Sequence, residues 1–96
     1  MPSFRITLII GALHSGIAPG AVLPNLAAAA AELTTVEASD LAVVAGSPRA
    51  IVRFTADDAA MALRVGDQVL AAARRQVEPV SWQVTERVKA RWYPVR

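Results

Sequence analysis

Three segments of the chain alternate apolar residues with polar or charged ones at a period of two. They are Ser3–Leu13, Ser47–Thr55 and residues 80–95. Such alternation is typical of strands that turn one face toward a core. The apolar positions are Phe4, Ile6, Leu8, Ile10, Ala50, Val52, Phe54, Val80, Trp82, Val84, Val88, Ala90 and Trp92. The sequence therefore predicts three strands with polar second faces, and other parts of the chain must cover the apolar faces.

Two segments with helical spacing supply that cover. In residues 19–33 apolar side chains recur every three or four positions, although Pro24 predicts either a later start or a kink. A second helix is predicted over residues 56–76, with Thr55 as its N-cap, two acids in its first turn and two arginines at its end. Gly66 inside this helix lowers its intrinsic stability, so we expect close packing there.

A further strand lies between these helices, and it gives the order of the elements. The stretch "VEASDLAVVAG" predicts a strand of uncertain parity, and "GSP" predicts the turn of a hairpin with Ser47–Thr55. Strand, helix, strand, strand, helix, strand is the order of the ferredoxin-like sandwich. We therefore expect an α+β fold over residues 1–96 as a single domain. Its two helices cover one face of a four-stranded antiparallel sheet, with the first and third strands in the centre.

The C-terminal strand is too long for an ordinary sheet. Its period holds for some fifteen residues, or roughly 45 Å at about 3.3 Å per residue, whereas strands usually have five or six residues. The sequence leaves three courses open. The strand overhangs the sheet, bends, or folds back as a hairpin around residues 86–89.

Composition narrows the chemistry and the location. With no cysteine, one histidine and eight scattered acids, we expect no disulfide, thiolate chemistry, metal or cofactor. The N-terminal apolar run followed by "LAAAAAE" resembles a secretory signal, but Thr7 interrupts it and His14 ends it. The run is also too short to span a bilayer. The expectation is a soluble, cytoplasmic protein without a membrane partner.

The polar faces of the predicted strands gather positive charge. If the alternating apolar residues pack under the helices, six of the ten cations share the open sheet face: Arg5, Arg49, Arg53, Arg87, Lys89 and Arg91. This face predicts binding to a polyanion, either nucleic acid or an acidic protein. A solvated face whose long side chains lie over apolar neighbours explains the same row without a ligand.

Two of these strands resemble the RNA-recognition motif, a ferredoxin-like family. "LIIGAL" (residues 8–13) is similar to its first-strand motif, and "RAIVRF" (residues 49–54) to the second half of its third-strand motif. The family stacks bases on aromatic rings, and the matching positions here are Ile9, Arg49 and Ile51. Without those rings the resemblance implies the fold and leaves sequence-specific RNA recognition in doubt.

Few residues point to catalysis. His14, Ser15 and Gly16 lie between the first strand and first helix, where backbone amides can hold a small anion, but a plain turn explains them better because no partner carboxylate or second nucleophile is at motif spacing. A pocket near His14 and Trp82 would suit a small ligand carrier or cofactor-independent enzyme of the dimeric ferredoxin-like type. Neither feature forms a catalytic motif, so no catalytic residue is predicted and an enzyme is disfavoured.

The first hypothesis is therefore a non-enzymatic interaction or assembly module. We expect it to form homo-oligomers through the open sheet face and the long last strand. The predicted interface residues are Ile9, Ile51, Thr85, Arg87 and Trp92. Polyanion binding and the small-ligand pocket remain the alternatives.

Overall fold

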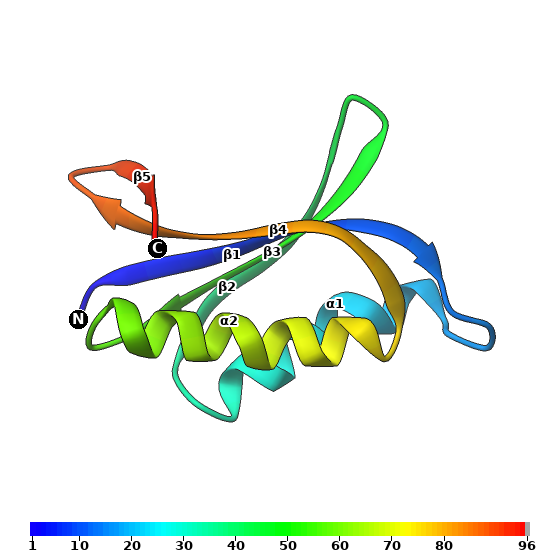
Figure 1. Ribbon diagram of the computed structural model, residues 1–96, viewed down its shortest axis with the longest axis horizontal. Helices are drawn as coiled ribbons and strands as arrows, with labels where there is room; N and C mark the ends of the chain where they lie inside the picture. The colour runs from blue at the N-terminus through cyan, green and yellow to red at the C-terminus, as the bar shows by residue number, and fades with distance from the viewer. Residues whose placement is uncertain (96) are drawn as a thin grey trace.

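A single antiparallel sheet organises the computed structural model, which describes residues 1–95. Along the chain the elements are β1 (Ser3–Leu13), α1 (Pro19–Ala31), β2 (Val36–Val44), β3 (Ser47–Thr55), α2 (Ala59–Arg74), β4 (Val77–Val88) and β5 (Arg91–Pro94). The strand order is β2-β3-β1-β4-β5, and both helices cover the same side of the sheet (Figure 1). This is an α+β, βαββαβ-like topology consistent with the ferredoxin-like fold, with β1 beside β3 as predicted.

The core lies between the sheet and the helices, where strand alternation places it. β1 and β3 contribute Phe4, Ile6, Leu8, Ala50, Val52 and Phe54, each no more than 1% exposed. Phe4 pairs with Phe54 across the two strands, and their rings stack with centroids 6.1 Å apart. The other residues of β1 and β3 consequently point to the side without helices, called the open face below.

The predicted four-stranded sheet with a long last strand is wrong, because the chain turns back after Val88. β4 ends there, and β5 pairs with it from Arg91 to Pro94, which adds a fifth strand. Lys89 and Ala90 form the turn with φ angles of 49° and 68°. Tight two-residue hairpin turns need this left-handed backbone, which Asn-Gly adopts most readily. A Lys-Ala turn gives no such signal, although a hairpin was one of the courses left open.

The hairpin also changes the side on which Trp92 lies. In a continuous strand Trp92 would share a face with Trp82, but in the hairpin it pairs with Arg87. Trp92 therefore lies on the same side of the sheet as Arg87, which is the open face. Trp82 pairs with Leu8 on the helix side, where its indole lies 5.3 Å from the guanidinium carbon of Arg74.

The two helices differ in how well their starts were predicted. α1 begins at Pro19, the first residue of the predicted range, and continues through Pro24, so the later start is wrong. α2 begins later than expected, because its N-cap is Asp58, whose Oδ1 accepts from the Met61 backbone N–H at 2.9 Å. Thr55 is instead the last residue of β3, where its backbone N–H donates to the carbonyl of Thr35. Among the described residues, neither helix is long and apolar enough to cross a membrane.

Gly66 packs α2 against the sheet, as its position inside the helix predicts. A Cβ atom at this position would lie 2.7 Å from Cγ2 of Val84 and 3.8 Å from Cδ1 of Ile6. Real Cβ atoms do not approach other atoms to 2.7 Å, so a side chain at residue 66 would have to displace Val84 or move α2 away from β4.

Candidate functional site

The open face is built from three neighbouring strands whose register is continuous. Across β1 and β3 the facing pairs are Arg5–Arg53, Thr7–Ile51 and Ile9–Arg49. On its other side β1 pairs with β4, which adds Thr85, Gln83 and Ser81 opposite the same three β1 residues. Three arginines, two isoleucines and four side chains with neutral polar groups thus share one surface, because strand parity leaves them no place in the core.

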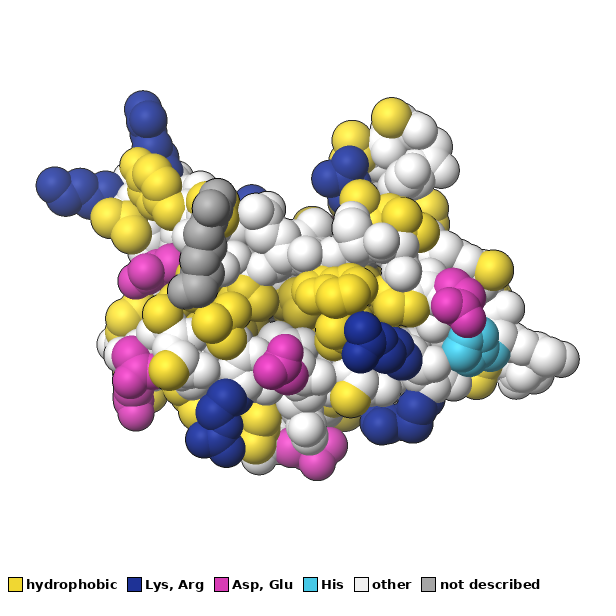
Figure 2. Space-filling view, viewed as in Figure 1, with side chains coloured by type: hydrophobic (Ala, Val, Ile, Leu, Met, Phe, Trp, Pro, Cys, Tyr) yellow, Lys and Arg dark blue, Asp and Glu magenta, His cyan; other side chains and the backbone are white. Residues whose placement is uncertain are grey.

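The surface is sunk between two projecting hairpins. The β2–β3 and β4–β5 turns both rise on the side away from the helices, at opposite ends of the sheet (Figure 1). The space-filling view shows the outline dipping between them (Figure 2). Two hollows occupy this region. The larger, of about 310 Å³, includes Thr7, and the smaller, of about 180 Å³, includes Ile51. Because Thr7 and Ile51 are cross-strand partners, the two hollows adjoin.

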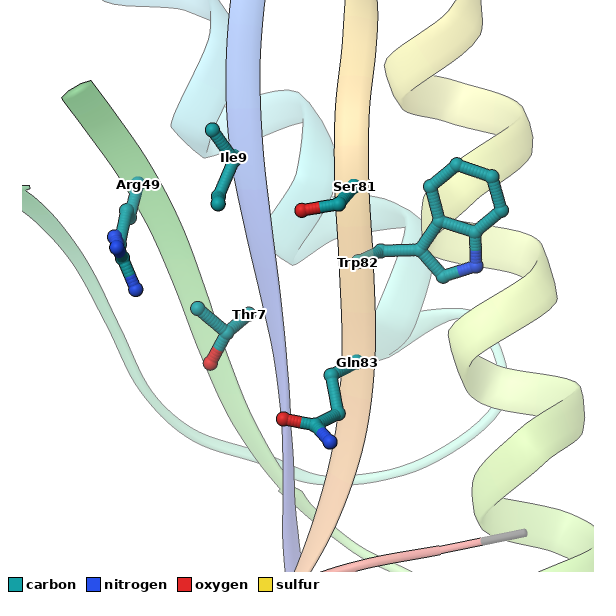
Figure 3. A pocket seen from close by; sticks show the side chains of 6 residues that line it. All are labelled: Thr7, Ile9, Arg49, Ser81, Trp82 and Gln83. Atoms are coloured by element: carbon teal, nitrogen blue, oxygen red, sulfur yellow. The ribbon is translucent and has the colours of Figure 1, made fainter.

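The larger hollow is surrounded by hydrogen-bonding side chains from three strands. Arg49 comes from β3, Thr7 from β1, and Ser81 and Gln83 from β4, and Ile9 completes the lining (Figure 3). Trp82 borders the hollow only through its position on β4, because its indole points the other way, toward α2 (Figure 3). No carboxylate lines this hollow among the described residues. The arrangement offers donors to a small anion.

The smaller hollow lies beside an arginine pair that is covered by an aromatic ring. Arg5 and Arg53 face each other directly, and like charges in that position repel. The ring of Trp92 lies over both, with its centroid 4.3 Å from Cζ of Arg5 and 5.5 Å from Cζ of Arg53. Glu37 adds a carboxylate 3.4 Å from Nε of Arg53, which is ion-pair distance without hydrogen-bond alignment. These contacts offset the repulsion within the pair.

The three arginines are half-buried, and their Nε atoms are buried without a hydrogen bond to any described residue. Arg5 and Arg53 have the contacts with Trp92 just described, but Arg49 makes no ion pair within residues 1–95. A half-buried guanidinium interacts with anions more strongly than one in open water, because the surrounding dielectric is lower. Of these three arginines, Arg49 is therefore the one whose charge is least compensated.

The structure brings together most, but not all, of the predicted face. Of the interface residues, Thr85 is buried, Arg87 is exposed, and Ile9, Ile51 and Trp92 are half-buried, all with open-face parity. Of the six cations, Arg5, Arg49, Arg53 and Arg87 share the face. The placement of Lys89 and Arg91 there is wrong, because Lys89 lies in the turn and Arg91 pairs with Val88, which has the opposite parity. The hairpin removes both from the row.

The loop of His14, Ser15 and Gly16 lies apart from this face. The Ile17 backbone N–H donates to the carbonyl of His14 at 3.2 Å, and Gly16 has a φ of 82°, so the segment is a tight turn. His14 Nε2 lies 3.3 Å from Oε1 of Glu78, and both side chains are more than one third exposed. Trp82 pairs with Leu8, about 20 Å along the strand from His14 at about 3.3 Å per residue. The register thus separates the two residues of the predicted ligand pocket.

Sequence patterns missed the acids that border the face. Glu37 and Asp40 are on β2, whose apolar residues do not alternate, and the register of β2 with β3 shifts between Val36 and Ala38. Nothing in the composition could reveal that shift.

Comparisons of the chain with protein-family models, with curated proteins and with solved structures gave no match.

Proposed function

We propose that the protein is a binding module whose open face receives an anionic polymer. The observation that carries this proposal is the register of β1 with β3, which lines up Arg5, Arg49 and Arg53 along one sunken surface. Arg87 extends the positive charge toward the β4–β5 hairpin. A row of cations in a concave surface attracts and orients a charged chain more strongly than the same charges on a convex one.

The same charges disfavour a second copy of the protein as the occupant of this face. A twofold interface places the same surface on both sides, so the arginines of one copy would meet those of the other. Two acids border the face, and one of them, Glu37, is already engaged with Arg53. Self-association through the open face would bury unpaired positive charge, which costs several kcal/mol per ion. An anionic partner removes that penalty.

Recognition of the polymer is expected to depend on charge more than on sequence. The RNA-recognition motif stacks bases on aromatic rings, and the positions of this chain that resemble those rings, Ile9, Arg49 and Ile51, are not aromatic. Trp92 has open-face parity, but its ring is already in contact with two arginines. Direct contacts with base edges are therefore few, and backbone charges supply most of the affinity.

Salt dependence tests this function. Binding of a fluorescently labelled single-stranded oligonucleotide should weaken as salt rises, with a log–log slope of about −3 if four arginines each neutralise one phosphate. Fluorescence anisotropy over a salt series measures the slope, and poly-glutamate provides the equivalent measurement for a carboxylate polymer. If neither polymer binds at low salt, the proposed function is wrong.

A second candidate function, self-assembly, is favoured by the free edge of β2. This strand pairs with β3 on one side only, and Val36–Val44 contains no proline or cation to protect the edge. Its side chains Leu41, Val43 and Val44 are 53%, 69% and 47% exposed. Two copies pairing antiparallel about Ala42 would place Leu41 of each opposite Val43 of the other. This edge differs from the face and last strand expected to form the interface.

Light scattering tests self-assembly. If β2 pairs between copies, the unsubstituted chain has a dimeric mass and Val43→Lys a monomeric one, because a lysine on this edge opposes pairing. Val80→Lys is a matched control, since Val80 is 66% exposed on β4. It should remain dimeric. A monomeric mass for the unsubstituted chain at high concentration excludes this candidate and leaves the anion-binding proposal unaffected.

A further inference from the structure

We infer that the larger hollow of the open face is a subsite for one phosphate group. The anionic polymer is then a nucleic-acid strand and not an acidic protein. The inference rests on the proposed function and names the chemistry of its ligand. The hollow brings together Arg49, Thr7, Ser81 and Gln83, which can all donate hydrogen bonds. Their side chains reach the same space from β3, β1 and β4 (Figure 3).

The direction of these donors favours phosphate over carboxylate. A carboxylate has two oxygens in one plane, which suits a planar partner on one side of it. A phosphate carries its oxygens tetrahedrally and accepts from several directions at once. Here the donors stand on three adjacent strands, with Arg49 on one side of β1 and Ser81 and Gln83 on the other. Donors spread over three strands can reach the oxygens of a tetrahedral group from several directions, whereas the two oxygens of one planar carboxylate would leave some donors without an acceptor.

The charge of the hollow matches a phosphodiester. Arg49 provides one positive charge without an ion-pair partner in the described part of the chain, and the other donors are neutral. A phosphodiester carries one negative charge, so the subsite neutralises it without leaving excess charge on either partner. The larger hollow also adjoins the smaller one, which is lined by Arg5, Arg53 and Trp92 and by one carboxylate, that of Asp40. The two arginines give a strand that leaves the phosphate site on this side a second positive region.

Titrations of the protein with two anions, monitored by NMR, test whether the larger hollow binds phosphate. Inorganic phosphate and acetate are added separately at equal ionic strength, and the backbone amides and the Arg49 Nε–H are observed. Phosphate should shift Thr7, Arg49, Ser81 and Gln83, and acetate should shift them far less. Arg49→Gln should weaken phosphate binding at least tenfold, because a hydrogen bond to a charged group is lost. Arg64→Gln, which removes an exposed arginine of α2 on the other side of the sheet, should leave phosphate binding unchanged.

Polymers separate this inference from the proposed function. Arg49→Gln should weaken oligonucleotide binding more than poly-glutamate binding, and Ser81→Ala should do the same to a smaller degree. Ser81 is exposed, so its substitution leaves the core intact. If phosphate and acetate shift the hollow equally, or both polymers lose the same factor, the phosphate inference is wrong and the proposed function stands. If phosphate shifts residues outside the hollow only, the subsite is wrong. If the unsubstituted protein binds neither polymer at low salt, the proposed function itself is wrong.

Discussion

Replacing Gly66 with valine is expected to lower the free energy of unfolding by about 3 kcal/mol, the upper end of the usual range for an overpacked core. The Cβ atom alone would lie 2.7 Å from Cγ2 of Val84, and valine adds two more methyl groups. Residue 66 is in α2 and Val84 is in β4, so neither residue can move without disturbing the core between the helices and the sheet. Urea unfolding followed by circular dichroism measures the change.

A matched substitution and a double variant separate overpacking from helix propensity. Ala71→Val places the same side chain at an exposed position of α2 and should change stability by less than about 1 kcal/mol. Gly66→Ala should destabilise by about 1 kcal/mol, since crowding exceeds the propensity that alanine gains. Combined with Val84→Ala, which removes the crowded methyl, it should cost less than the two single changes together. Additive effects would show that α2 and β4 do not touch at residue 66.

The fold was predictable where burial alone decides a residue's place. The alternation in β1 and β3 predicted their core faces because a register slip by one residue would expose Phe4 and Phe54. Gly66 was predictable for a similar reason, since a glycine inside a helix is tolerated where packing requires it. Both predictions depend only on local sequence patterns, the alternation within a strand and a glycine within a helix, and such patterns can be read directly from the sequence.

The course of the chain after Val88 was not predictable in the same way. Lys89 and Ala90 have no preference for the left-handed backbone that they adopt, so the turn depends on the pairing that follows it. Its consequences reach the candidate site. The turn places Trp92 over Arg5 and Arg53, and it takes Lys89 and Arg91 out of the cationic row. The arginines of β1 and β3 were foreseen, whereas their aromatic cover depended on tertiary structure.

If the anionic polymer binds to the open face and does not simply respond to the net charge of the protein, removing two arginines from this face should weaken binding far more than removing two from the helix side. The double variant Arg5→Gln with Arg49→Gln removes two positive charges from the open face. Arg64→Gln with Arg75→Gln removes two exposed arginines of the helix side, one within α2 and one at its C-cap. Both double variants lower the formal charge from +2 to 0.

Two lost charge-assisted contacts correspond to about a hundredfold in affinity, at about tenfold each. Loss of Arg5 also relieves its repulsion with Arg53, so the open-face variant should keep its fold, which circular dichroism checks. The direct measurement is oligonucleotide affinity by fluorescence anisotropy at one fixed low salt concentration for the two double variants. We expect about a hundredfold weakening for the open-face pair and less than about threefold for the helix-side pair. Equal losses in the two variants would contradict the account, because binding would then follow net charge and not the surface that the sheet register creates.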